Sequence, residues 1–174
     1  AIMLSAESAA GKYPVEAVSM MNAISVQVER DPAYPSIISA QRSPPEATGA
    51  DAISTAARQI AETLNLSAII TYTASGTTGL RAARERPQVP IIALSPVVAT
   101  ARRLSLAWGT HCVVTEDATD LDDMVDRACR ITFEEHFGRP GDRVIVTAGV
   151  PLRTPGATNM LRIAYIGSDG LGGI

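Results

Sequence analysis

The feature that most constrains the fold is an alternation, between residues 49 and 166, of short apolar runs with segments of helical spacing. Strands separated by helices of this length imply crossover connections and a mostly parallel sheet. The runs are almost continuous in Ile, Val and Ala, which is typical of strands covered on both faces. The predicted strands are residues 68–71, 90–94, 111–114, 143–147 and 161–166.

Apolar residues at intervals of three and four positions predict the helices between these strands. They cover residues 49–64, 77–85, 97–106 and 120–137. No helical segment separates the last two strands, so we expect residues 161–166 to run antiparallel at an edge. The predicted fold class is α/β, with a mostly parallel five-stranded sheet flanked by helices and an antiparallel edge strand.

The first part of the chain differs in pattern. Residues 1–4 predict a short strand, and Pro14 begins a helix that reaches about Arg30. Residues 32–47 contain four prolines and few periodic apolar residues, which predicts a linker. Because the chain opens inside an apolar segment, we expect it to be a piece of a longer protein. The predicted division is 1–31 as a strand and helix, 32–47 as linker, 48–167 as the α/β domain and 168–174 as a flexible Gly-rich tail.

Composition excludes several classes of function. A net charge of −3 argues against a nucleic-acid surface, and 4% aromatic residues argue against a base-stacking platform. The chain contains no apolar run of the roughly 20 residues that a membrane helix needs. Its two cysteines, Cys112 and Cys129, have no metal-ligand spacing, so we predict a reduced, cytoplasmic setting.

A hydroxyl-rich turn follows the strand predicted at residues 68–71 and precedes the helix predicted at 77–85. Free backbone N–H groups and the dipole at a helix N-terminus favour an anion, and the turn's hydroxyls add donors. The same residues also suit an ordinary helix cap, so the pattern leaves both interpretations open. The turn consists of Thr73, Ala74, Ser75, Gly76, Thr77 and Thr78.

Other features around this turn narrow its chemistry. No Gly-Lys-Ser/Thr follows it and it is not Gly-x-Gly-x-x-Gly, which disfavours a nucleoside triphosphatase or a dinucleotide-binding unit. Arg81 is placed in sequence to neutralise an anion bound there.

An acidic cluster at residues 116–126 is interpreted as a helix N-terminus rather than a metal site.

Five segments resemble pyruvate kinase. Residues 2–18 read IMLSAESAAGKYPVEAV and resemble that family's pattern MLSGETAxGxYPxEAV, at the end of its catalytic barrel. Three later segments, PIIALS at 90–95, GDRVIVTAG at 141–149 and TNMLRI at 158–163, are similar to its C-terminal domain. Together with residues 101–109 they match in order and cover about residues 1–166.

The resemblance implies the last strand and helix of a (β/α)₈ barrel, followed by the regulatory and subunit-contact domain. The parent enzyme would transfer a phosphoryl group from phosphoenolpyruvate to ADP in glycolysis, as a cytoplasmic homotetramer that uses Mg²⁺ and commonly K⁺. The family's catalytic lysine, metal-binding carboxylates and nucleotide contacts lie upstream of the match. The resemblance therefore implies a chain that is inactive alone and binds neither ion, with Ser5 as a minor contact at the active-site rim.

The resemblance also assigns residues 73–78 to the family's effector-phosphate loop, Thr-x-Ser-Gly-x-Ser/Thr. The loop lacks the basic residue that some members carry, and a Trp of the closing loop is missing, with Arg153 as the nearest replacement cation. In the barrel motif, Ala6 and Ser8 replace the family's Gly and Thr. From the missing basic residue and the missing Trp around the effector loop, we expect one intact phosphate subsite and an effector such as AMP or a sugar monophosphate.

An alternative is a stand-alone α/β module that binds a phosphorylated metabolite and has no enzymatic activity. The barrel-end motif argues against it, because a free module has no use for one strand and helix of a barrel.

Overall fold

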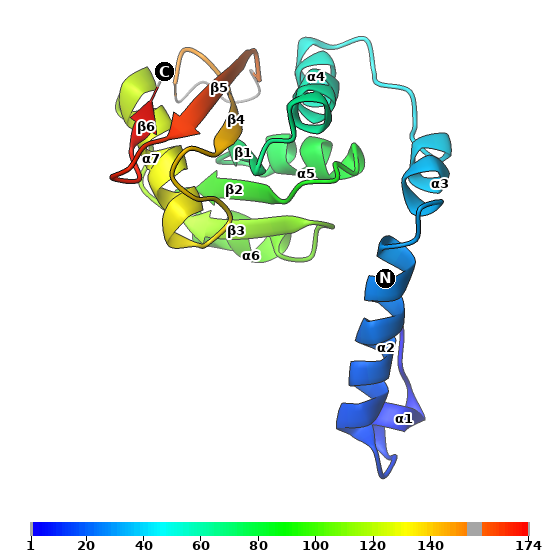
Figure 1. Cartoon of the computed structure of the whole chain (residues 1–174). Helices are drawn as coiled ribbons and strands as arrows, with labels where there is room; N and C mark the ends of the chain where they lie inside the picture. The colour runs from blue at the N-terminus through cyan, green and yellow to red at the C-terminus, as the bar shows by residue number, and fades with distance from the viewer. Residues whose placement is uncertain (1, 153–157, 174) are drawn as a thin grey trace. The chain divides into compact units, whose positions relative to one another are not determined.

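A computed structural model describes residues 2–152 and 158–173. The chain forms two compact units, one ending at Gln41 and the other beginning at Arg42 (Figure 1). The division falls inside the segment predicted as a linker, and each unit is described by itself. Among the helices of the described residues, none is long and apolar enough to cross a membrane.

The first unit is helical, with α1 (Ala6–Ala9), α2 (Pro14–Glu29) and α3 (Tyr34–Ala40). The helix predicted from Pro14 is confirmed, with the proline in its first turn. The strand expected at residues 1–4 is not formed at 2–4, because this unit offers no neighbouring strand to receive its hydrogen bonds. The expected linker contains α3, since Pro35 lies in that helix's first turn, where proline is tolerated.

The second unit is built on one twisted sheet of six strands. The order is β3-β2-β1-β4-β5-β6; β1 to β4 are parallel, whereas β5 and β6 are antiparallel to their neighbours. The five predicted strands and the antiparallel direction of the fifth are confirmed. The strands are β1 (Ala68–Tyr72), β2 (Ile91–Ser95), β3 (Thr110–Val114), β4 (Arg143–Ala148), β5 (Met160–Ile166) and β6 (Gly172–Gly173).

Strand β6 forms where only a flexible tail was predicted, and it makes β6 rather than β5 the edge. The Gly172 N–H donates to Asp126 Oδ1 at 3.1 Å, and Gly172 pairs with Ile166. A Cβ on Gly172 would lie 2.7 Å from the Val125 side chain, so the absence of a side chain lets this segment pack against α7.

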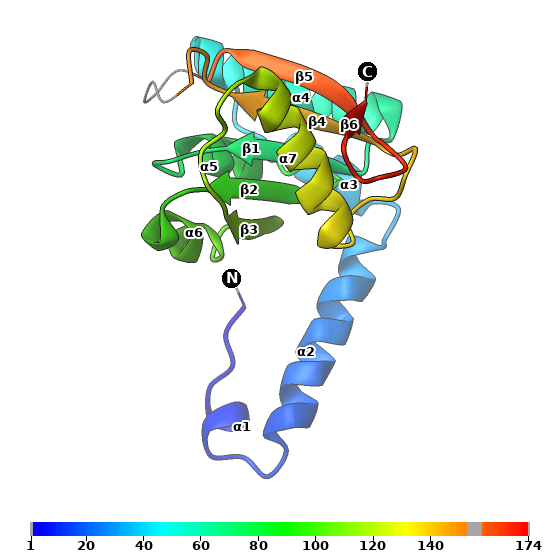
Figure 2. The same cartoon turned by 90° about the vertical axis from the view of Figure 1, so that its left-hand side faces the viewer.

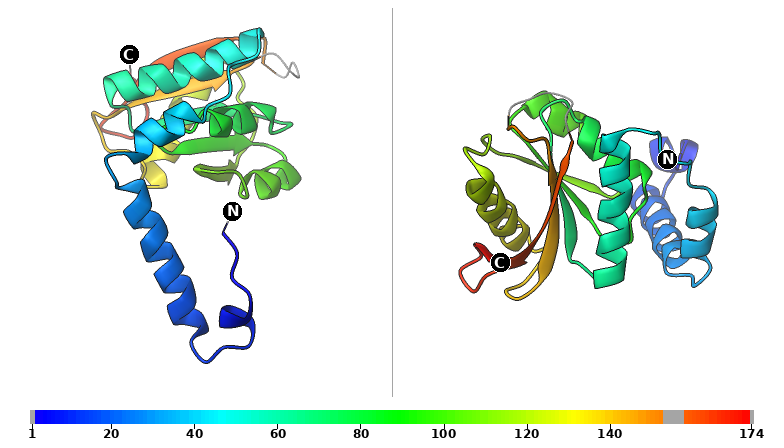
Figure 3. Two further views of the ribbon diagram at one scale, coloured as in Figure 1. Left: turned by 90° about the vertical axis from the view of Figure 1, so that its right-hand side faces the viewer. Right: turned by 90° about the horizontal axis from the view of Figure 1, so that it is seen from above.

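Helices cover both faces of the sheet, as the continuous apolar strands predict (Figures 2 and 3). Helix α7 packs on one face over Ile70, Ile92 and Val146, while α4 and α5 pack on the other over Ile69 and Ile91. This arrangement places the loops that follow the parallel strands at one rim of the sheet. The helices are α4 (Gly49–Leu64), α5 (Thr77–Arg84), α6 (Val98–Leu104) and α7 (Leu121–Glu134).

Candidate functional site

The hydroxyl-rich turn lies where the topology of the sheet changes direction. From β1 the chain passes through α5 to β2, whereas β4, on the other side of β1, is reached from β3 through α7 on the opposite face. The gap between the carboxyl ends of β1 and β4 is therefore a topological switch point, the place where open α/β sheets bind ligands. Residues 73–76 follow β1 directly, so the predicted turn is at this position.

The conformation of the turn depends on Gly76. This residue has φ of +91°, in the left-handed region, and its N–H donates to Thr73 Oγ1 at 2.8 Å. Thr73 and Gly76 are buried, whereas Ala74, Ser75 and Thr77 are exposed. The buried pair fixes the shape of the turn and leaves the residues at its tip open to solvent.

Two hydroxyls and the first N–H groups of α5 are available at this tip. Ser75 Oγ and Thr77 Oγ1 lie 2.9 Å apart, and both residues are exposed. The N–H of Leu80 is the first to bond back to the turn, to the Gly76 carbonyl at 3.0 Å, so the preceding N–H groups of α5 have no carbonyl in the helix to receive them. Such a group of donors, with the positive end of the helix dipole, suits a phosphate or carboxylate.

Thr78 has a different role from the exposed hydroxyls. It is buried, and its Oγ1 lies 2.9 Å from Oγ1 of Thr158, which is also buried and precedes β5. This contact ties the first turn of α5 to the chain entering β5. Thr78 therefore fixes the helix at the switch point, and the residues that can reach a ligand directly are Ser75 and Thr77.

Helix α6 holds the turn from a second side. Thr100 Oγ1 donates to the Ala74 carbonyl at 2.9 Å, and the Arg103 guanidinium donates to the Ser75 carbonyl. A Cβ on Gly76 would lie 3.0 Å from Arg103 Nη2, so the glycine also makes room for this guanidinium. The sequence patterns did not indicate Thr100, Arg103 or Thr158 as residues near the turn. Helix α6 lies near the turn that follows β1 because connections between neighbouring parallel strands are right-handed, which no local pattern shows.

Arg81, predicted to neutralise a bound anion, is engaged elsewhere. Its Nε lies 3.0 Å from Oδ1 of Asp51, which is fully buried, and Arg84 Nη2 lies 2.6 Å from the other carboxylate oxygen. The Arg84 hydrogen bond, followed by the Glu46 N–H, holds the pKa of Asp51 below its ordinary value. These arginines fasten α5 to α4.

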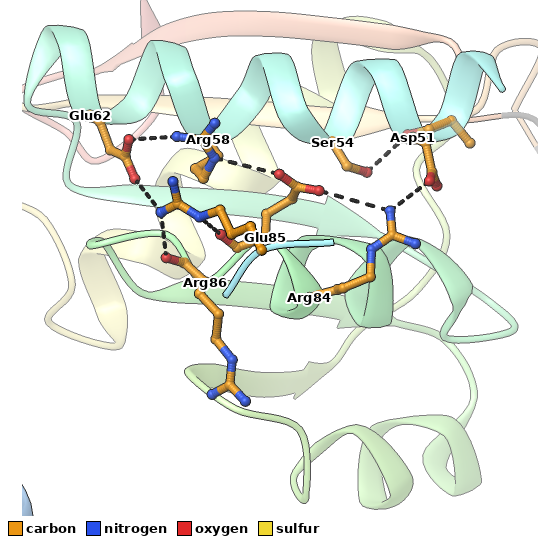
Figure 4. Close-up of polar contacts among 9 residues, drawn as sticks. Asp51, Ser54, Arg58, Glu62, Arg84, Glu85 and Arg86 are labelled. Atoms are coloured by element: carbon orange, nitrogen blue, oxygen red, sulfur yellow. Dashed lines mark hydrogen bonds and ion pairs between the residues drawn. The ribbon is translucent and has the colours of Figure 1, made fainter. Parts of the chain in front are cut away.

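A wider polar network surrounds the last turn of α5 (Figure 4). Arg58 lies 2.7 Å from Glu62 within α4 and 3.5 Å from Glu85 at the end of α5. Arg42 donates from Nε to the Glu85 carbonyl at 3.0 Å. The network joins α4, α5 and the start of this unit through ion pairs that are mostly shielded from solvent.

The remaining predicted site residues belong to the first unit, to the start of α7 or to the part of the chain outside the described residues. Ser5 belongs to the first unit and its Oγ donates to Glu7 Oε2 at 3.1 Å. Arg153 lies outside the described residues. In the acidic cluster, Asp120 caps α7 by accepting from the N–H groups of Asp122 and Asp123 at 3.0 and 2.9 Å, as expected for a helix N-terminus.

Comparison with known proteins gives a consistent result. The family model described as the α/β domain of pyruvate kinase matches residues 51–164. A pyruvate kinase of Methylorubrum extorquens is 58% identical over 166 residues, covering 95% of this chain and 35% of the relative. A pyruvate kinase of Geobacillus stearothermophilus is 37% identical over 166 residues, covering 95% and 28%.

A solved structure agrees. The crystal structure of a pyruvate kinase from Cryptosporidium parvum matches with a TM-score of 0.80 and 29% identity, over 94% of this chain and 32% of that one. The chain thus spans about a third of the length of curated relatives such as the pyruvate kinase of Methylorubrum extorquens.

Proposed function

The chain belongs to the pyruvate kinase family, and from this premise we propose that it is the part of such an enzyme that binds a phosphorylated effector. In the proposed whole enzyme, phosphoryl transfer from phosphoenolpyruvate to ADP takes place on residues that this chain does not contain. The chain alone is then a regulatory and subunit-contact unit of a cytoplasmic homotetramer, without turnover of its own.

The observation that carries this proposal is the position and chemistry of residues 73–78. The turn lies at the switch point of the sheet, and the exposed residues Ser75 and Thr77 stand beside the first N–H groups of α5, which have no carbonyl within the helix to receive them. A phosphate offers several acceptor oxygens and accepts from all of these donors at once. One such cluster of donors favours a single phosphate, so the proposed effector is a sugar monophosphate or a nucleoside monophosphate such as AMP.

The proposed family reaction uses Mg²⁺ and commonly K⁺. Among residues 2–152 and 158–173, no group of three or more His, Cys, Asp and Glu side chains is placed to hold a metal ion. We assign no step of the proposed function to either ion.

Thermal unfolding of the 174-residue chain tests the binding proposal. A ligand that binds only the native state increases the free energy of unfolding, by about 2.7 kcal/mol at a ligand concentration of a hundred times its Kd. The melting temperature rises accordingly. We expect at least one of AMP, ribose 5-phosphate, glucose 6-phosphate and fructose 1,6-bisphosphate to do so. We expect Ser75→Ala to weaken that effect without lowering the melting temperature of the free protein, and Thr78→Ala to weaken it and lower that temperature.

If none of the four compounds stabilises the chain, or if Ser75→Ala and Thr78→Ala leave the stabilisation untouched, the proposed site is wrong. A separate assay for pyruvate formation from phosphoenolpyruvate and ADP is expected to show no turnover. Measurable activity would contradict the proposed division between regulatory and catalytic parts.

A further inference from the structure

The turn at residues 73–78, the proposed effector loop, has no basic residue of its own. The side chains of Ala74, Ser75 and Thr77 carry no charge, and Arg81 is bound to Asp51. A phosphate held by neutral donors alone would bind weakly, because charge-assisted hydrogen bonds are about twice as strong as neutral ones. Among the described residues, Arg103 in the last turn of α6 contacts the tip of the turn, through the Ser75 carbonyl.

We propose that Arg103 is the phosphate-binding cation of this site and that it exchanges its present partner, the Ser75 carbonyl, for the phosphate of the effector. The inference rests on the proposed function and adds to it a specificity-determining residue from a second helix. It also makes α6, together with α5, an element whose contacts change on binding.

The geometry around the guanidinium supports this role. Arg103 donates to the carbonyl of Ser75, the residue whose side-chain hydroxyl faces solvent beside Thr77. A guanidinium has five N–H donors in a planar fork, so Arg103 can donate to two oxygens of a phosphate in place of one carbonyl. Gly76 lets the guanidinium approach the turn, because a Cβ there would lie 3.0 Å from Arg103 Nη2.

The arginines of α5 provide a contrast. Arg81 and Arg84 both pair with the buried carboxylate of Asp51, at 3.0 and 2.6 Å. The partner recorded for Arg103 among the described residues is an uncharged carbonyl, and the residue is exposed. A phosphate dianion attracts a guanidinium more strongly than a carbonyl does, so its arrival would draw Arg103 away from Ser75. Moving Arg81 or Arg84 would instead leave a buried carboxylate without its partner.

The test compares Arg103→Met with Arg102→Met by isothermal titration with AMP, ribose 5-phosphate, glucose 6-phosphate and fructose 1,6-bisphosphate. Arg102 lies on the same helix and is exposed, so both variants lose the same charge from α6. We expect Arg103→Met to weaken binding of each compound that the wild-type chain binds by roughly 10-fold or more, and Arg102→Met by less than about 2-fold. Arg103→Lys keeps the positive charge but loses the planar guanidinium, so we expect its affinity to lie between those of the Arg103→Met and Arg102→Met variants.

A charge contact has a second readout that a merely structural role would not change. The affinity of the wild-type chain should fall as NaCl is raised, and that of Arg103→Met should fall less steeply. If the wild type binds a compound and the Arg103→Met and Arg102→Met variants bind it with equal affinity, this inference is overturned and the proposed function stands. Absence of binding in the wild type would overturn both.

Discussion

The two ends of helix α5 differ in how their charges are satisfied. At the last turn, the chain supplies its own cations: Arg42 donates to the carbonyls of Glu85 and Arg86 at 3.0 and 3.4 Å, and Arg58 pairs with the Glu85 side chain. At the first turn, Ser75 and Thr77 are exposed, and the N–H groups that precede that of Leu80 have no carbonyl within the helix to receive them. A helix favours cations at its carboxyl end and anions at its amino end. The protein fills the carboxyl end itself, and we propose that a ligand fills the amino end.

This difference separates the arginines that fasten helices together from Arg103, the proposed phosphate-binding arginine. In Figure 4, Arg58 and Arg84 point into a network with Asp51, Glu62 and Glu85, which fastens α5 to α4. The arginine at the amino end, Arg103, comes from the next helix and meets only a carbonyl of the turn in the described residues. The proximity of an arginine to the turn in the sequence is therefore a poor guide to which one binds an anion.

The largest expected effect comes from the carboxyl end. Asp51→Asn removes the charge that Arg81 and Arg84 share, and we expect it to lower the free energy of unfolding by roughly 2–4 kcal/mol. Phosphate affinity should change little, because Asp51 does not contact the turn. Asp122→Asn is the control, since its side chain is 90% exposed and its loss should cost less than about 0.5 kcal/mol. Equal stability of the two variants in urea unfolding would contradict a structural role for this end.

The same carboxylate predicts a pH dependence. The pKa of Asp51 lies below its ordinary value because Arg84 and the Glu46 N–H bind the ionised form. The contribution of Asp51 to the free energy of unfolding is therefore complete above the carboxyl pKa of the unfolded chain, about 4. This contribution is lost as the pH falls through the lowered pKa of the folded state. In urea unfolding between pH 7 and pH 3, the stability difference between wild type and Asp51→Asn should be constant down to about pH 5 and shrink below pH 4. A difference that grows on acidification would refute this account.

A smaller effect is expected at the amino end. Gly76→Ala puts a side chain at φ of +91°, which costs about 1–2 kcal/mol, and crowds Arg103. We expect both stability and phosphate affinity to fall. The matched control is Gly49→Ala, in the first turn of α4, where a Cβ meets nothing within 4 Å and an alanine should be neutral or stabilising by up to about 1 kcal/mol. If Gly76→Ala leaves the phosphate affinity unchanged, the conformation of the turn does not matter for ligand binding, which contradicts the proposed site.

The sequence predicts most of the α/β unit because local patterns dominate there. The helix at Gly49–Leu64 and the five main strands follow from apolar spacing, since each element buries one or both faces in a single core. The turn at residues 73–76 follows in the same way, from its place between a strand and a helix.

The missed features depend on partners far away in the chain. The partner of Arg81 is Asp51, thirty positions earlier, and the turn's contact from Arg103 crosses to the next helix. Helix α3 was missed because prolines near a helix start resemble those of a linker, and β6 because glycines that pack closely resemble those of a free tail. These features follow from tertiary contacts, which single-sequence patterns do not encode.

The most direct test of the account is amide NMR of the 174-residue chain during titration with glucose 6-phosphate and, separately, AMP. At saturation with a compound that binds, we expect large shifts of the backbone N–H signals of Ser75, Gly76 and Thr77, because the proposed phosphate position lies beside these residues. The signals of Glu85 and Arg86, at the end that the protein fills itself, should barely move. Shifts confined to the carboxyl end of α5, or absent from residues 75–77 with both compounds, would contradict the central claim.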